Sequence, residues 1–247
     1  MIEHEQFQKK LYGRRKGPKP SAHKEALRRS LLPRLALKLV PGADPRSYFS
    51  SPVEEVWLEV GFGAGEHLLA LARGNPYIGL IGAEPYEAGV AKLLSKIQSG
   101  LSSPVYGGGV RRCSEGAEPD GGGFNIRIHE GDARDVLAAL PPASLGKVFI
   151  LFPDPWPKTR HHKRRFVQME MLEALAHVLK PGGELRLASD DAGYIDWTLE
   201  RILNHPAFVW TAEGPGDWRR RPPDWPETRY ETKALHGPPV FLRVMRV

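Results

Sequence analysis

The residues of this sequence that most clearly could carry out chemistry lie around an aspartate between two prolines. The segment, FPDPWPKTRHHKRR, spans residues 152–165 and places Asp154 directly before a proline, a tryptophan and a third proline. Prolines fix their own φ and restrict the preceding residue to extended conformations, so we expect the turn to hold the carboxylate in one position. The cations that follow are Lys158, Arg160, Lys163, Arg164 and Arg165. The segment therefore places one rigidly held carboxylate beside five cations.

A glycine-rich motif, EVGFGAG, occupies residues 59–65. Gly61, Gly63 and Gly65 follow Glu59 in a predicted strand-to-helix turn, where glycine permits positive φ and close approach of a ligand. A dinucleotide fingerprint would need a glycine at position 66, but Glu66 stands there and is a poor neighbour for a phosphate. The alternatives for this motif alone are a nicotinamide dinucleotide site and a plain glycine-rich turn among surface acids.

Acids at the ends of the next two predicted strands favour a cationic ligand that carries adenosine. Glu84 ends the second strand, where a carboxylate can accept both hydroxyls of a ribose. Asp132 ends the third strand, where it can border a purine ring. Together with Glu59 they predict a pocket with three carboxylates and no phosphate-binding lysine or arginine. S-adenosylmethionine is a ligand that suits such a pocket.

The elements that must position these residues follow from hydrophobic patterning. From residue 56 onward, apolar runs alternate with helical patterns in five strand-then-helix units. The predicted strands cover residues 56–61, 77–84, 124–132, 147–154 and 183–190, and the predicted helices cover 67–73, 88–98, 136–140, 166–180 and 194–203. This pattern predicts an α/β fold with a doubly wound, mostly parallel sheet, in which ligands bind at the carboxyl ends of the strands. Residues 239–247 alternate with period two and predict an antiparallel edge strand.

Charge is distributed unevenly along the chain. The formal net charge is +6, of which residues 1–50 contribute +8 and the other 197 residues −2. We predict a basic, partly disordered N-terminal arm at 1–50 and one domain at 51–247, with a flexible glycine-rich insertion at 99–123. The arm favours a polyanionic partner, nucleic acid ahead of membrane. The alternative is a solubilising tail.

Composition narrows the class of protein further. With 41% hydrophobic and 26% charged residues, the chain is typical of a globular protein, and no apolar run approaches the length of a membrane span. The N-terminus lacks the apolar region of a secretory signal, and Cys113 is the single cysteine, so we expect a cytoplasmic protein without disulfides. His161 and His162 are adjacent and cannot share one helix face, so we expect no metal.

Several motifs together resemble the bacterial tRNA (guanine-N7-)-methyltransferases. These are FPDPWPKTRHHKRRF, LEVGFGAGEHL, GAEPYEAGV, LKPGGELRLASDDAGY, TRYETKALHGPPVF and the N-terminal YGRRKG. The resemblance covers nearly the whole chain outside residues 99–123. It implies a class I, Rossmann-like methyltransferase fold with S-adenosylmethionine as methyl donor. It also implies methylation of N7 of a guanine in the variable loop of tRNA. The sequence leaves open whether the protein is a monomer or a homodimer.

The resemblance implies roles for individual residues as well. On the cofactor side of the site it places Glu59, Gly61, Gly63, Gly65, Glu84, Asp132 and Asp154, the last as the catalytic residue. As substrate contacts it implies Lys158, Asp190, Thr228, Arg229, Tyr230 and Glu231, together with the RNA-contacting stretch Arg160, Lys163, Arg164 and Arg165. The family often has lysine where this chain has Arg229, so the charge is kept while a compact ammonium becomes a planar fork.

The implied reaction needs little acid–base chemistry. Guanine N7 carries an exposed lone pair and loses no proton when it attacks a methyl group, so alignment should supply much of the acceleration. Asp154 would stabilise the positive charge that develops on the base. Trp156 either stacks on a purine or caps the sheet end.

Two other functions stay open from the residues alone. The first is an amino-directed methyltransferase, although the Asp-Pro-Pro-Tyr type of turn is replaced here by Asp-Pro-Trp-Pro at residues 154–157. The second is a non-catalytic RNA-binding protein that has kept the fold.

Overall fold

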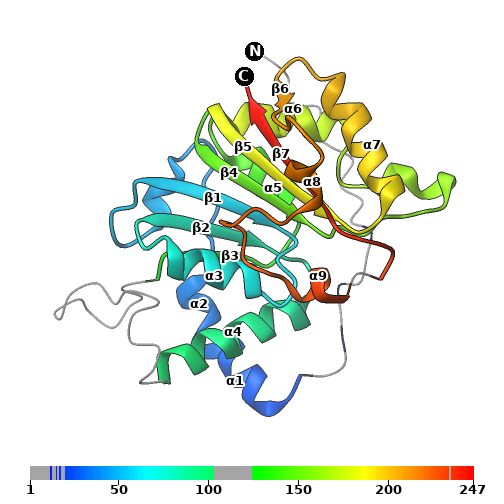
Figure 1. Cartoon of the computed structure of the whole chain (residues 1–247). Helices are drawn as coiled ribbons and strands as arrows, with labels where there is room; N and C mark the ends of the chain where they lie inside the picture. The colour runs from blue at the N-terminus through cyan, green and yellow to red at the C-terminus, as the bar shows by residue number, and fades with distance from the viewer. Residues whose placement is uncertain (1–11, 13–14, 16, 18–19, 103–123, 234) are drawn as a thin grey trace.

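The computed structural model describes residues 12, 15, 17, 20–102, 124–233 and 235–247 (Figure 1). Most of the predicted insertion therefore lies outside the described residues, as does Cys113. Within the described residues, no helix is both long and apolar enough to cross a membrane.

A single mixed sheet forms the centre of the described structure. Its strands are β1 (Glu55–Val60), β2 (Ile78–Ala83), β3 (Ile126–His129), β4 (Leu145–Leu151), β5 (Leu179–Ser189), β6 (Phe208–Trp210) and β7 (Val240–Arg246). The order across the sheet is β3-β2-β1-β4-β5-β7-β6. Neighbours from β3 to β5 are parallel, whereas β7 is antiparallel to both β5 and β6. The predicted doubly wound, mostly parallel sheet with an antiparallel last strand is thus confirmed.

The prediction that residues 239–247 form an edge strand is wrong. β7 lies between β5 and β6, so β6 is the edge of the sheet. The reason is that β6 has three residues, too few to show a period in the sequence. The predicted antiparallel direction of β7 is confirmed by its pairing with β5 and β6.

Helices cover both faces of the sheet (Figure 1). One face carries α5 (Ala133–Ala139), α6 (Met169–Val178) and α7 (Ala192–Leu203), and the other carries α1 (Ala22–Ser30), α2 (Leu32–Leu35), α3 (Glu66–Gly74) and α4 (Glu87–Ser102). Alternate residues of each strand face the two layers, so Leu58 belongs to the first hydrophobic cluster and Trp57 to the second. Helix α6 begins three residues later than predicted, because Gln168 is extended.

Part of the predicted N-terminal arm packs on the domain. Helix α1 is capped by the Ser21 hydroxyl, which accepts from Lys24 N, and its Leu27 is buried. Leu31 and Leu35 are buried in the same cluster as helix α4. Arg28 donates to both carboxylate oxygens of Glu130, at 2.6 and 3.1 Å. Residues 21–35 therefore belong to the packed body, while the division of the chain at residue 50 stays a prediction.

The stretch between β6 and β7, which we call the cover segment (residues 211–233), crosses one face of the sheet (Figure 1). It contains two short helices, α8 (Gly216–Arg219) and α9 (Arg229–Lys233). Trp225 is buried in it and packs edge-on against Phe241 of β7, with 5.7 Å between ring centroids.

Candidate active site

A cavity of about 390 Å³ opens at the carboxyl ends of β1, β2 and β4. The predicted site residues that line this cavity are Gly61, Gly63, Glu84, Asp132, Asp154 and Arg164. This is where a doubly wound sheet binds its ligands. The volume falls in the range of small-molecule sites in proteins.

The glycine loop has the backbone that its sequence predicts. Gly61, Gly63 and Gly65 adopt φ of 69°, 56° and 73°, values that favour glycine. Gly61 and Gly63 line the cavity, whereas Gly65 begins helix α3 and packs against Leu93 of α4. A Cβ at position 65 would lie 2.6 Å from Leu93 Cδ1. Gly65 therefore shapes the loop through packing and does not line the cavity wall.

Glu84 ties the end of β2 to the glycine loop. Its Oε2 accepts from Gly63 N at 2.7 Å and its Oε1 accepts from Tyr86 N at 2.8 Å. Burial raises the pKa of the Glu84 carboxyl, although these two backbone donors lower it. Each carboxylate oxygen has a second lone pair, so Glu84 can still accept hydroxyl groups of a ligand in the cavity.

Asp132 caps helix α5 and pairs with Arg134. Its Oδ1 accepts from Arg134 N at 3.0 Å, and its Oδ2 accepts from Arg134 Nη1 at 2.9 Å. Both residues line the cavity, as does Arg164. The prediction of a pocket without arginine is therefore wrong. The sequence could not show this, because Arg134 reaches the wall from inside a helix and Arg164 from a distant turn.

Glu59 does not line the cavity. It is buried behind the glycine loop, where its Oε2 lies 3.0 Å from His67 Nδ1. The His67 ring packs edge-on against Phe149, with 5.0 Å between centroids. Direct contact of Glu59 with a cofactor stays a prediction, and in the structure its carboxylate supports the start of α3.

The turn around Asp154 has an unusual backbone. Phe152 and Trp156 adopt φ of 49° and 45°. Phe152 precedes Pro153, one of the two prolines that flank Asp154, so the prediction that the residues before these prolines are extended is wrong for Phe152. Non-glycine residues in this region cost on the order of 1–3 kcal/mol each and occur preferentially at functional sites. Phe152 is held by its N–H, which donates to Ala188 O of β5 at 2.7 Å.

The Asp154 carboxylate lies at the mouth of the cavity. Its side chain reaches solvent, and none of the described residues forms a hydrogen bond or an ion pair with it. Packed atoms nearby still desolvate the carboxyl and raise its pKa. A carboxylate without a partner among the described residues is available to act on a ligand.

Aromatic rings hold Arg164 at the same mouth. Its guanidinium carbon lies 4.9 Å from the centroid of Trp156 and 4.8 Å from that of Tyr12. Tyr12 and Trp156 both line the cavity, and cation–π contacts of this kind are worth about 0.5–2 kcal/mol. The contribution of Tyr12 was not predicted; the only signal was its place in the YGRRKG motif.

The basic run separates into exposed and buried members. Residues Thr159–Arg164 form a short 3₁₀ helix, η3, and Lys158, Arg160 and Lys163 on this run are exposed. Arg165 is buried, and it donates to Pro155 O at 2.8 Å and to Gly193 O at 3.0 Å. Arg165, predicted to contact RNA, instead braces the turn that carries Asp154.

The remaining predicted residues lie beyond the cavity wall. Asp190 Oδ2 accepts from His236 N at 3.1 Å, and Thr228 Oγ1 accepts from Glu231 N at 3.1 Å. Burial would raise the pKa of Glu66 in α3, but Lys96 and, more weakly, Arg229 lower it, so Arg229 lies near the start of α3. The side chain of Tyr230 is outside the described part of the chain. Substrate contacts by these residues stay a prediction.

The chain is similar to known proteins. Residues 53–239 match a family model described as "Putative methyltransferase". The solved structure of the 16S rRNA methyltransferase KamB shares 15% identity with a TM-score of 0.48, over 86% of this chain and 97% of that one. The match to the family model defines the protein as a methyltransferase, and its fold is α/β.

Closer relatives identify the family within this class. A tRNA (guanine-N(7)-)-methyltransferase of Rhodospirillum rubrum is 48% identical over 92% of this chain and 83% of its own length. One from Paramagnetospirillum magneticum is 45% identical over 96% of this chain and 92% of its own length. The chain belongs to the family of tRNA (guanine-N(7)-)-methyltransferases.

Proposed function

We propose that this protein transfers a methyl group from S-adenosylmethionine to N7 of a guanine in the variable loop of tRNA. The observation that carries the proposal is the position of Asp154: a carboxylate with no partner among the described residues, at a cavity that Glu84 and Asp132 also line. The names of the relatives supply the substrate and the position of the methyl group.

The cavity fits the methyl donor. Glu84 would accept the ribose hydroxyls with the lone pairs that Gly63 N and Tyr86 N leave free. Asp132 would border the adenine, and the backbone of Gly61 and Gly63 allows close approach. When bound, S-adenosylmethionine supplies a methyl group on a positively charged sulfur, a charge that acidic residues at the cavity favour.

Asp154 acts on the guanine. N7 carries a free lone pair, so the site needs no group that removes a proton. Positive charge grows on the imidazole part of the base as the methyl group arrives, and a carboxylate beside that ring stabilises it. The left-handed residues and prolines around Asp154 fix where the carboxylate stands, which favours alignment of the base.

Exposed cations beside this mouth would bind the tRNA backbone. Lys158, Arg160 and Lys163 lie on the run that follows Asp154, and Arg219 and Arg220 are exposed on the cover segment. Inside the cavity, by contrast, Arg134 is already paired with Asp132. Phosphate contacts of this kind position the substrate without reading its sequence.

Incubation with labelled S-adenosylmethionine and unmodified bulk tRNA, followed by nucleoside chromatography, tests the proposal. We expect the label in 7-methylguanosine. Label in an adenosine or in protein would point instead to an amino-directed methyltransferase. No label, with tRNA binding retained, would indicate a non-catalytic RNA-binding protein.

A further inference from the structure

The two faces of the sheet are covered by different means. On the face that carries α3 and α4, the helices reach as far as Phe149 of β4. Beyond it, the same face of β5 and β7 carries Glu184, Arg186 and Arg243, which are neighbours by strand register. The cover segment lies over this region, and among its described residues Trp225 is the only buried one. Trp218 of α8 is partly buried against Trp210 of β6, so Trp225 is the apolar anchor of the stretch around Asp224. One buried side chain gives this stretch limited hydrophobic stabilisation.

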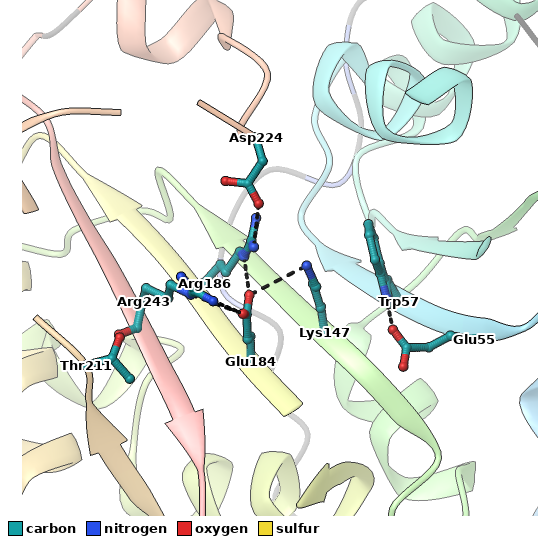
Figure 2. Close-up of polar contacts among 8 residues, drawn as sticks. All are labelled: Glu55, Trp57, Lys147, Glu184, Arg186, Thr211, Asp224 and Arg243. Atoms are coloured by element: carbon teal, nitrogen blue, oxygen red, sulfur yellow. Dashed lines mark hydrogen bonds and ion pairs between the residues drawn. The ribbon is translucent and has the colours of Figure 1, made fainter. Parts of the chain in front are cut away.

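The charge of Arg186 adds to the stabilisation of the docked cover segment. Its side chain is 4% exposed, yet Nη2 contacts Asp224 Oδ2 of the cover segment at 2.6 Å, and Nε donates to Glu184 Oε2 at 2.7 Å. Figure 2 shows the guanidinium between these two carboxylates. It also lies 5.6 Å from the ring centroid of Trp225 and 5.7 Å from that of Phe149. The arginine therefore contacts both the ionic and the aromatic part of the docked segment.

The cover segment contributes Asp224 to the cluster of charged residues around Arg186 (Figure 2). Glu184 is already shared, since it pairs with Arg243 and lies 3.7 Å from Lys147 Nζ. Without Asp224, three cations would face the carboxylate of Glu184 alone. Leaving a buried charge short of its partner is costly, so the cluster favours the docked position of the cover segment.

A chain of contacts leads from Asp224 to the predicted substrate residues. Trp225 follows Asp224 directly, and its carbonyl accepts from Arg221 Nη1 at 2.8 Å. Arg221 Nε donates to Glu231 Oε1 at 3.0 Å. Glu231 N in turn donates to Thr228 Oγ1. These hydrogen bonds therefore connect the docked stretch around Asp224 with the first turn of α9.

We propose that Arg186 is a positioning residue for the transfer reaction: by pairing with Asp224 it docks the cover segment and places residues 228–231 toward the substrate. The proposal rests on the proposed function, because it takes those four residues as substrate contacts. Arg186 itself touches neither the base nor the cofactor cavity. Its effect on the reaction is transmitted through the cover segment.

The test compares Asp224→Ala, Asp224→Glu and Glu200→Gln with the unchanged protein. The Asp224 side chain is 59% exposed, so its removal leaves the core intact. Glu200 on α7 is the matched control, a 69% exposed acid that pairs with the more buried Arg201 on its own helix. Two quantities are measured on the full chain: amide hydrogen exchange of peptides covering 222–231, and kcat and KM for tRNA at saturating S-adenosylmethionine.

In Asp224→Ala we expect exchange in 222–231 to accelerate about tenfold or more, and kcat to fall about tenfold because the substrate is misplaced. Affinity for S-adenosylmethionine should stay within about twofold, since Glu84 and Asp132 are untouched. Asp224→Glu should recover most of both losses, and Glu200→Gln should change neither.

Unchanged exchange in Asp224→Ala would overturn the docking role of the pair. Faster exchange with unchanged kcat would overturn the positioning role, because the segment would then be merely structural. If the unchanged protein fails to methylate tRNA, the proposed function is wrong, while the exchange measurement still decides whether Arg186 docks the segment.

Discussion

Asp154 differs from the other acids of the site in having no partner among the described residues. Glu84 is bound by two backbone donors, and Asp132 by Arg134. These contacts hold the loops that form the cavity in place. The field of Asp154 is instead available to a base that becomes positively charged. The geometry therefore separates acids that build the cavity from the one that acts at its mouth.

Replacing Asp154 with Asn keeps the shape of the side chain and removes its charge. We expect kcat to fall about a hundredfold, the scale of losing one preorganised electrostatic contact, with tRNA affinity nearly unchanged. Single-turnover methylation and filter binding measure the two quantities. Asp196→Asn on α7, which is exposed, should be neutral in both. A loss of tRNA affinity equal to the loss in kcat would assign Asp154 to binding instead.

As pH falls, activity should be lost at a higher pH than it would be if both carboxyl groups had their ordinary pKa values. Burial raises the pKa of Asp154 above its usual 3.8 and that of Glu84 above its usual 4.5. Both groups act as carboxylates, so activity should be present above the raised pKa values and lost as pH falls through them. A profile of kcat/KM against pH measures this, with circular dichroism to confirm folding. Activity that stays constant down to about pH 4 in the folded protein would contradict the assignment.

At the site, the sequence predicted the acids better than their surroundings. Glu84, Asp132 and Asp154 meet at one cavity because each follows a parallel strand, which is a rule of topology. Glu59 turns out to lie behind the loop, since alternate residues of β1 face different layers and its side chain meets His67. Tyr12 and Arg164 join the cavity through tertiary contacts that no local pattern encodes.

At the scale of elements, helix α4 holds the glycine loop in place. Gly89, in its first turn, packs against the loop so closely that an added Cβ would lie 2.4 Å from the carbonyl oxygen of Gly63 and 3.3 Å from Glu84. Backbone cannot yield as a flexible side chain can. The absence of a side chain at position 89 therefore sets the distance between α4 and the cavity.

Gly89→Ala should push α4 and the loop apart. We expect a loss of about 1–3 kcal/mol in stability, as for overpacked cores, together with weaker binding of S-adenosylmethionine. Thermal unfolding and calorimetric titration measure the two effects. Gly74→Ala, at the end of α3, adds its methyl group to open space. It should change neither the stability nor the affinity for S-adenosylmethionine. Equal cofactor affinity in both variants would show that the contact between Gly89 and Gly63 does not shape the site.

The elements themselves were predictable where their period was long. Five parallel strands and their helices follow from alternating apolar patterns. The position of β7 in the sheet did not follow from these patterns, because strand order depends on which strand β6 pairs with. The short helix η3 and the late start of α6 reflect proline and tertiary constraints on residues 157–168. Propensity alone does not capture such constraints.

At the scale of the whole molecule, positive charge is concentrated at the N-terminus. Residues 1–50 carry a net +8 and the rest of the chain a net −2. If about five phosphates are neutralised there and at η3, tRNA affinity should fall with log salt at a slope of roughly −3 to −4. Binding titrations at several salt concentrations measure the slope. A slope near zero would exclude phosphate contacts as the main source of affinity.

Deleting residues 1–20 should weaken tRNA binding and flatten its salt dependence. The deletion also removes Tyr12 from the cavity wall, so a second variant is needed. It replaces Lys9, Lys10, Arg14, Lys16 and Lys19 with Gln. This variant should reproduce the effect on tRNA and leave affinity for S-adenosylmethionine unchanged. Unchanged tRNA affinity at low salt in both variants would make the arm a solubilising tail.

The direction of β7 has a practical consequence. Because β7 runs against its neighbours, its last residues pair with the beginning of β5, with Met245 opposite Glu184. The chain therefore ends at the side of the sheet opposite the cavity, with Val247 56% exposed. An affinity tag or a surface linker attached there would leave the cavity facing solution. The same attachment at the other terminus would begin eleven residues before Tyr12, a part of the cavity wall.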